Sequence, residues 1–141
     1  MSGGAGRLAA DPPEAERDSS AAPVAPAQAV RTFEKSDLAP REARHFVVDT
    51  FQQWGEAALA YDAAMVVTEL ATNAVVHAHT GFTVTVCRAA DAIRISVRDG
   101  QPAAAPLVPE AGHGLGLVAA VARHWAAEPL PDGKRVWAEV G

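Results

Sequence analysis

The sequence predicts an α+β domain, a two-layer α/β sandwich in which helices cover one face of a mixed, mainly antiparallel sheet. Short segments of alternating apolar residues, joined by tight turns, predict neighbouring antiparallel strands. Longer segments with apolar residues at a spacing of three and four predict amphipathic helices. The chain has 141 residues, of which 49% are hydrophobic, and this suits one core and one domain.

The first expected strand covers residues 29–33, and a helix follows it. Ser36 or Asp37 is suited to cap this helix, Pro40 to start it and Gly55 to end it. The core-facing side of the helix is predicted from residues at helical spacing: Ala43, Phe46, Val47, Thr50, Phe51 and Trp54.

The later elements are expected from periodicity and from Gly and Pro signals. They are, in order, a helix at 61–79 ended by Gly81, strands at 83–88 and 92–98 around a hairpin turn at 89–91, a Pro-rich loop at 100–112, a helix at 114–125, a turn at 129–133 and a strand at 135–140. A further short strand fits near residues 126–128.

The first 28 residues differ in composition from the rest. Pro, Gly, Ala and Ser dominate them, and they contain no aromatic residue. Such a segment buries too little apolar surface to offset the entropy of ordering, so we expect a disordered tail at 1–28 and a folded domain at 29–141. The alternative is a segment that folds on contact with a partner, and composition does not separate the two.

Composition also excludes several classes of protein. No run of 18 apolar residues is present, and the start lacks the pattern of a secretory signal, so we expect neither a membrane span nor secretion. Cys87 is the single cysteine, which excludes a disulfide scaffold and favours a reducing, cytoplasmic compartment. The net charge of −5 argues against a general nucleic-acid binder.

Three polar residues, Glu69, Asn73 and His77, recur at steps of four along the second expected helix. At about 3.6 residues per turn they lie near one stripe of the helix, bordered by apolar residues. A carboxylate and a carboxamide one turn apart are suited to hold Mg²⁺ or its waters beside a phosphate. The alternative is a solvated polar face of an amphipathic helix.

Asp99 and Gly100 directly follow an expected strand. An aspartate at such a place often starts a turn, and glycine permits tight backbone geometry. The functional interpretation is a carboxylate at the mouth of a pocket, which accepts a hydrogen bond from an amino group of a ligand.

Glycines alternate with larger residues before the third expected helix, in the order Gly112, His113, Gly114, Leu115, Gly116 and Leu117. Free backbone N–H groups at a helix start can hold phosphate, and the alternative is a flexible hinge. No Gly-Lys-Ser/Thr follows, which excludes a Walker loop. The lack of a preceding strand and of an acidic residue about 20 positions later argues against a dinucleotide fingerprint.

Other chemistries find little support in the sequence. His77 and His79 are two residues apart on a helix and point different ways, and no Cys or His cluster has zinc spacing. There is no Gly-x-Ser-x-Gly elbow. Cys87 lies in mid-strand, where a buried inert thiol is favoured over a nucleophile.

The order of these motifs resembles the GHKL (Bergerat-fold) ATP-binding superfamily, also called histidine-kinase-like ATPases. Within it, the chain is similar to the small anti-sigma regulatory serine/threonine kinases of actinobacteria, over roughly residues 29–141. Four stretches carry the resemblance: residues 69–78, 97–102, 112–118 and 133–137.

The resemblance implies a role for each matching position. Asn73 would bind Mg²⁺ between the phosphates of ATP, Glu69 would be the catalytic base, and Asp99 would bind the adenine amino group. The loop at 100–112 would be a lid. The other contacts with the cofactor would come from His77, Gly100, Gly112, His113, Gly114, Leu115, Gly116, Leu117 and Lys134.

Two positions depart from the superfamily pattern. The box that begins at Asp99 is usually Asp-x-Gly-x-Gly, and both of those glycines are missing here, which bears on the mobility of the lid. Lys134 stands where many relatives have threonine. Because a lysine cannot accept a hydrogen bond, the water network around adenine is expected to differ.

The resemblance therefore implies an ATP- and Mg²⁺-dependent kinase that sequesters a sigma factor and phosphorylates a serine or threonine of an anti-anti-sigma (STAS-type) partner. Direct contact with nucleic acid or membrane is not expected, and relatives often form homodimers. No phosphoacceptor helix pair or transducer domain is recognisable, which argues against a complete sensor kinase, topoisomerase or chaperone. Two alternatives stay open: a non-catalytic nucleotide-binding module, and a degenerate member that binds partners without nucleotide.

Overall fold

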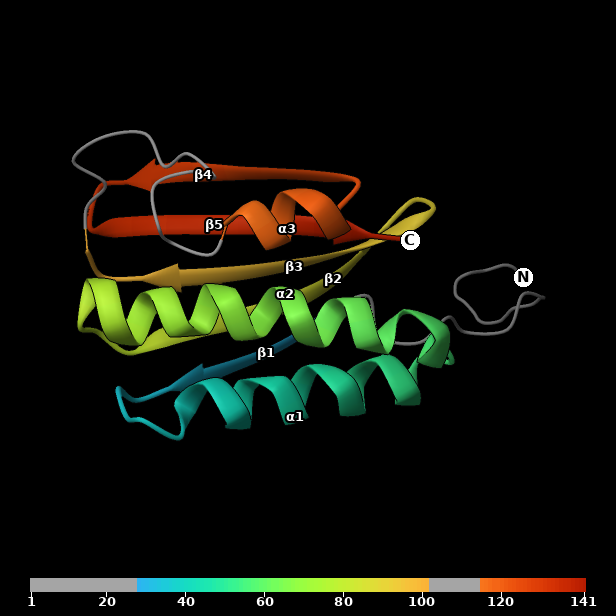
Figure 1. The fold of residues 1–141 in the computed structure, drawn as a ribbon, viewed down its shortest axis with the longest axis horizontal. Helices are drawn as coiled ribbons and strands as arrows, with labels where there is room; N and C mark the ends of the chain where they lie inside the picture. Colours follow the sequence, from blue (N-terminus) through green and yellow to red (C-terminus); the bar gives the residue numbers. More distant parts are fainter. Residues whose placement is uncertain (1–27, 102–114) are drawn as a thin grey trace, which may run out of the picture.

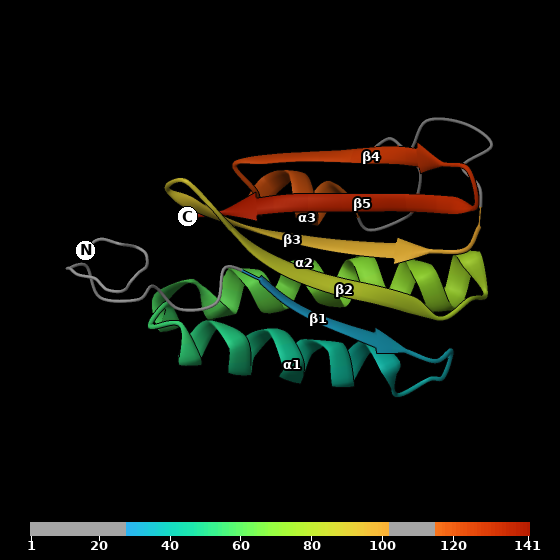
Figure 2. The same cartoon turned by 180° about the vertical axis from the view of Figure 1, so that it is seen from behind.

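The computed structural model describes residues 28–101 and 115–141. These residues form a five-stranded sheet with three α-helices on one of its faces (Figures 1 and 2). The predicted α+β class and the two-layer arrangement are therefore confirmed. The expected tail at 1–28 lies almost wholly outside the described residues, so it stays a prediction.

The elements follow one another in this order: β1 (Gln28–Phe33), α1 (Ala39–Gln53), the short 3₁₀ turn η1 (Ala57–Leu59), α2 (Ala60–Thr72), the π-helical turn η2 (Asn73–Ala78), β2 (Phe82–Ala89), β3 (Ala92–Asp99), α3 (Leu115–Val121), β4 (His124–Leu130) and β5 (Gly133–Val140). The strand order across the sheet is β1-β2-β3-β5-β4. Every neighbouring pair of these strands is antiparallel, so the sheet is not mixed in its described part.

The helix predicted at 114–125 is wrong after Val121. α3 ends at Val121, and His124 and Trp125 lie in β4 instead. β4 pairs with β5 along its whole length, from His124 opposite Glu139 to Leu130 opposite Gly133. This pairing overrides the helical spacing of the small residues before it, because strand formation depends on neighbours more than on local pattern. The short strand predicted near 126–128 is the middle of β4.

The end of the second helix also differs from the prediction. His79 takes the left-handed conformation that ends the helix, with φ of 59°, and its N–H donates to the carbonyl oxygen of Ala74. Gly81 has another reason to be glycine. A Cβ there would come within 2.6 Å of the carbonyl oxygen of Phe33 at the end of β1.

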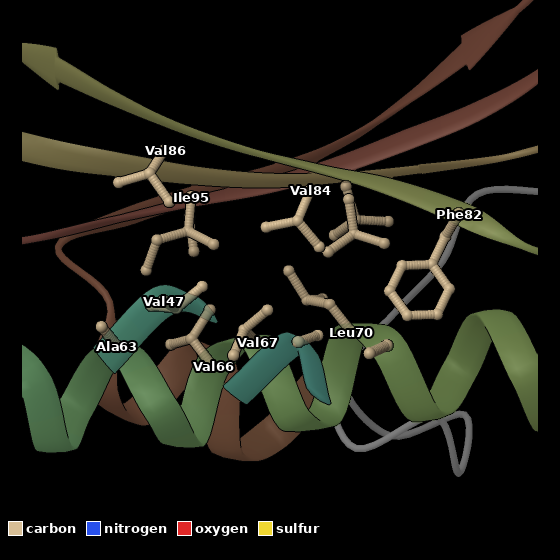
Figure 3. Close-up of a cluster of buried hydrophobic side chains, with 14 of the residues drawn as sticks. Val47, Ala63, Val66, Val67, Leu70, Phe82, Val84, Val86 and Ile95 are labelled. Atoms are coloured by element: carbon tan, nitrogen blue, oxygen red, sulfur yellow. The ribbon is translucent and has the colours of Figure 1, made fainter. Parts of the chain in front are cut away.

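The hydrophobic core lies between the helices and the inner face of the sheet (Figure 3). α1 contributes Val47 and Phe51, and α2 contributes Val66, Val67 and Leu70. Successive side chains of a strand point to opposite faces, so alternate residues of β2, β3 and β5 meet the helices. These buried strand residues are Val84, Val86, Ile93, Ile95, Val97, Val136, Ala138 and Val140.

The helical stretch Ala57–Val76 is long and apolar enough to cross a membrane by length and composition, with a mean hydropathy of 1.2. Half of this stretch is buried inside the protein. In Figure 1 the helix α2 lies along the sheet, between α1 and α3. A central core helix passes the same test of composition as a membrane span does.

Candidate functional site

Three elements that carry predicted site residues reach the same end of the sandwich. The C-terminal end of η2, the C-terminal end of β3 and the first residues of β5 lie together at the left of Figure 1. The sheet register pairs Asp99, the last residue of β3, with Lys134, the second residue of β5. The fold therefore unites residues that are far apart in the sequence.

Asp99 and Lys134 form a buried ion pair. The Nζ atom of Lys134 lies 2.7 Å from Oδ2 of Asp99, and the two side chains are 10% and 5% exposed, in that order. The other carboxylate oxygen, Oδ1, accepts a hydrogen bond of 2.9 Å from the backbone N–H of Gln101. Asp99 thus shapes the turn, as one interpretation predicted, while its Oδ2 atom already holds a cation.

This ion pair is not among the sequence-based predictions, although the sequence holds a signal for it. Lys134 is in phase with Val136, Ala138 and Val140, which are the buried positions of β5. A lysine that continues a buried phase at the end of a strand needs a partner, because an unpaired buried charge is costly.

Asn73 is the first residue of η2, and its side chain holds a buried donor without a partner. Its Nδ2 atom has no hydrogen-bond partner among the described residues. An unsatisfied buried amide costs about 1–3 kcal/mol, so native proteins keep one mainly where a ligand completes it. The amide of Asn73 therefore fits a site for phosphate and Mg²⁺, since it offers both an N–H donor and an oxygen ligand.

Glu69 lies one helical turn before Asn73. The backbone N–H of Asn73 donates to the carbonyl oxygen of Glu69, so the α-helical spacing between these two residues holds as predicted. The Glu69 side chain is half-buried. Within the part of the chain that the structure describes, its carboxylate has no hydrogen bond or ion pair, which leaves it available to a reactant.

The backbone changes its helical spacing between Asn73 and His77. From Asn73 onward the backbone forms a π-helical turn, with bonds from residue i to i+5, instead of an α-helical one. Such π turns occur frequently at functional sites.

The predicted phosphate loop falls partly outside the described residues, which exclude Gly112, His113 and Gly114. Leu115, Gly116 and Leu117 are the first three residues of α3, whose opening N–H groups have no acceptor within the helix. The side chain of Leu115 is fully buried in the core, so only its backbone can face a ligand. Gly116 and Leu117 are exposed.

Gly100 follows β3 at the same end of the sandwich. Gly100 is exposed, and its N–H lies 3.4 Å from Oγ1 of Thr80, which ties the end of β3 to the segment after η2. No group of three or more His, Cys, Asp or Glu side chains placed to hold a metal occurs among the described residues.

Comparison with known proteins agrees with this architecture. Residues 34–140 match the family model of the histidine kinase-like ATPase domain. A solved structure, that of the RsbU and RsbW domains of Rv1364c from Mycobacterium tuberculosis, is similar in fold, with a TM-score of 0.65 and 19% sequence identity. The match covers 80% of this chain but only 32% of that one, so this chain spans about a third of its length. No curated protein matches the chain.

The family match includes the helix that carries Glu69 and Asn73 and the strands that carry Asp99 and Lys134. It confirms the predicted resemblance. The chain belongs to the histidine kinase-like ATPase domain family, which implies that it binds a nucleotide.

Proposed function

We propose that this protein binds ATP with Mg²⁺ at the end of the sandwich and acts as an anti-sigma-type serine/threonine kinase of the cytoplasm. The observation that carries the proposal is the buried Nδ2 atom of Asn73, which has no hydrogen-bond partner among the described residues and lies one turn from the Glu69 carboxylate. Both residues occur where the family pattern expects them. The similarity in fold to a structure of RsbU and RsbW domains supports a regulatory role of this kind.

Each residue of the site has a proposed task. Asn73 holds Mg²⁺ through its side-chain oxygen, and the bound ion neutralises charge on the phosphates of ATP. Glu69 accepts the proton of the attacking hydroxyl group. Asp99 accepts a hydrogen bond from the adenine amino group. The backbone N–H groups of Gly114 and Gly116 bind phosphate, and Leu115 and Leu117 contribute through their backbone.

The remaining predicted contacts belong to the same proposal. Gly100, Gly112, His113 and His77 complete the surroundings of the nucleotide. The acceptor of the phosphoryl group is a serine or threonine on an STAS-type partner. A phosphate adds a charge of about −1.5 to −2 and would change the contact surface of that partner. Sequestration of a sigma factor is the regulatory output.

A second candidate function is a nucleotide-binding module without phosphoryl transfer. The box that begins at Asp99 favours it, because both glycines of the superfamily pattern are missing there, and they bear on the mobility of the lid. In that case the nucleotide would only set the affinity for a partner.

The first test is calorimetry on the purified chain with Mg²⁺ and ATP, ADP or GTP, beside Asp99→Asn. Asparagine keeps an acceptor for Lys134, and a thermal unfolding curve shows whether the variant folds. We expect adenine-selective binding that Asp99→Asn loses. If the folded wild type binds no nucleotide, the kinase proposal is wrong.

The second test separates the two candidate functions. Glu69→Ala should bind ATP but lose phosphoryl transfer to a candidate STAS-type partner, measured with labelled ATP. Asp62→Ala, which removes a carboxylate from the first turn of the same helix, is the matched control and should keep transfer. Full transfer by Glu69→Ala would contradict its role as the base. Binding without transfer by the wild type would favour the non-catalytic module.

A further inference from the structure

Asp99 and Lys134 are the two charged residues that are buried among the described residues, with 7% and 8% of their surfaces exposed. They lie directly opposite each other on β3 and β5 and in phase with the buried positions of both strands. Their side chains therefore belong to the layer between the sheet and the helices, at the end of the sandwich that holds the proposed nucleotide site.

This ion pair uses only part of its hydrogen-bonding capacity. An ammonium group has three N–H donors, and an ionised carboxylate accepts about four hydrogen bonds. Asp99 takes one donor of Lys134 at 2.7 Å and accepts one further bond from the backbone of Gln101. Within the described part of the chain no other acceptor for the Lys134 ammonium is found. Among the described residues, a spare donor and a spare acceptor thus lie side by side.

We propose that Lys134 reads the nucleobase together with Asp99. Adenine carries an amino donor next to a ring-nitrogen acceptor on either side of it, N1 or N7. Asp99 accepts from the amino group, and Lys134 donates to the neighbouring ring nitrogen. Lys134 is then a specificity-determining residue in direct contact with the base. This inference rests on the proposed ATP site. It concerns position 134, where many relatives have threonine and this chain has lysine.

The energetics of the ion pair favour this role over a purely structural one. A buried ion pair gains little stability over well-packed apolar residues, because both charges lose their water. On their exposed face the same two strands already form an ion pair, between Arg94 and Glu139, so structural pairing between them needs no buried charge. A ligand that takes up the spare donor and acceptor gives a reason for the burial.

Base analogues test the inference on the unaltered protein. Calorimetry would compare ATP with 1-deaza-ATP and 7-deaza-ATP, each of which replaces one ring nitrogen by C–H. A hydrogen bond to a charged donor contributes about tenfold or more to affinity, so one of these two analogues should bind about tenfold or more weakly. The weaker analogue identifies the nitrogen. Equal affinity for ATP and both analogues would overturn the inference.

Two variants sharpen this test. Lys134→Met should bind ATP and the discriminated analogue with equal affinity. Arg135→Met removes the same charge from the next residue of β5, on the opposite face, and should keep the full discrimination. If Lys134→Met binds ATP more tightly than the wild type, the lysine obstructs the base instead of reading it, and the inference is wrong.

The possible failures are distinguishable. Absence of any ATP binding would overturn the proposed function and this inference together. ATP binding that ignores both ring nitrogens would overturn this inference alone. Because the analogue series uses the wild type, the result does not depend on whether Lys134→Met folds.

Discussion

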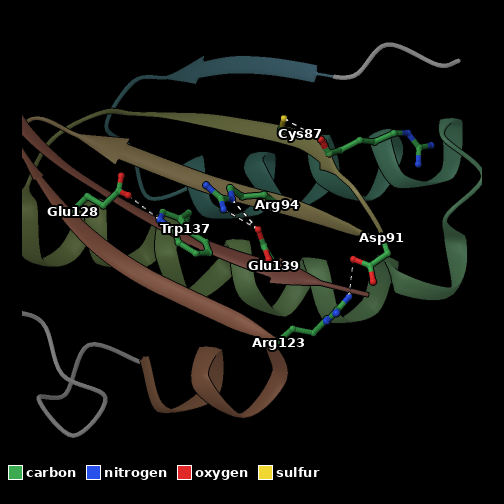
Figure 4. Close-up of polar contacts among 8 residues, drawn as sticks. Cys87, Asp91, Arg94, Arg123, Glu128, Trp137 and Glu139 are labelled. Carbon is green, nitrogen blue, oxygen red and sulfur yellow. Dashed lines mark hydrogen bonds and ion pairs between the residues drawn. The ribbon is translucent and has the colours of Figure 1, made fainter.

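Both faces of the β3–β5 strand pair carry ion pairs, but the ion pair on the inner face is buried and those on the outer face are exposed to solvent. The inner face carries the ion pair of Lys134 and Asp99, whose side chains are 10% and 5% exposed. The outer face, which no helix covers, carries ion pairs such as Arg98 with Asp132, whose side chains are 47% and 73% exposed (Figure 4 draws part of this face). The alternation of side chains along a strand produces this contrast within adjacent residues.

The charged groups of the outer face satisfy one another and meet water. Arg94 donates to Glu139 and lies 3.8 Å from the ring centre of Trp137, and the indole N–H of Trp137 donates to Glu128 (Figure 4). Arg135 donates to the other carboxylate oxygen of Glu128. Exposed pairs of this kind contribute little to stability, whereas loss of one partner from a buried pair is costly. The outer charges therefore cover an exposed surface, whereas the inner pair lies buried at the end of the sandwich where we propose the nucleotide site.

The largest effect is expected from breaking the inner pair. Lys134→Met leaves the carboxylate of Asp99 buried without a counter-charge and should lower the free energy of unfolding by about 3–5 kcal/mol. Urea denaturation measures this change. Removing both charges in Lys134→Met with Asp99→Asn should restore most of the loss. If the single and double variants were equally unstable, the cost would lie in packing and not in charge.

A smaller loss is expected from the backbone that brings the pair together. In Gly133→Ala, the new Cβ would overlap the carbonyl oxygen of Asp99, so β5 must move away from β3. Overpacking of this kind costs about 1–3 kcal/mol and should also weaken nucleotide binding. Gly100→Ala is the matched control, because its Cβ would make only an ordinary contact with Thr80 at 3.8 Å. Equal stability of the two variants, measured by thermal unfolding, would contradict this account.

The outer face should tolerate the loss of a charge. Arg135→Met breaks an ion pair whose side chains are 39% and 44% exposed. We expect a change in the free energy of unfolding of about 0–1 kcal/mol, which added salt reduces further because ions screen exposed charges. Urea denaturation at low and high salt checks this. A loss as large as that of Lys134→Met would erase the difference between the two faces.

The smallest expected effect is a loss of folding stability at low pH through Glu128. Hydrogen bonds from Arg135 and then from Trp137 hold the pKa of Glu128 below its usual value of 4.5. The unfolded chain therefore binds this proton more readily than the folded chain does. The resulting stability is present above that value and is lost as the pH falls through the lower pKa of the folded state.

Replacing the carboxylate tests this pH dependence. At neutral pH the wild type should melt at a slightly higher temperature than Glu128→Gln. This difference should shrink as the pH falls below 4.5, the usual pKa of the carboxyl group, and vanish once the carboxyl group is protonated in both states. A difference that persists or grows in acid would contradict the assignment.

Local signals in the sequence predicted most of the elements. The apolar spacing of α1 and α2 and the alternation in β2, β3 and β5 reflect direct contact with the core, so each segment carries its own pattern. The helix predicted at 114–125 failed after Val121, because β4 is set by pairing with β5 and not by its own alternation. His79, and not Gly81, takes the left-handed conformation that ends the helix.

The sequence by itself determined the fold class, the family and the residue types of the site, since these depend on periodicity and on motif order. Only the tertiary structure decided how the site residues meet. It paired Asp99 with Lys134, left Nδ2 of Asn73 without a partner among the described residues and turned the backbone out of α-helical spacing before His77. The physical reason is that register and burial arise from contacts between distant segments, and a local pattern does not contain the segment that will lie opposite it.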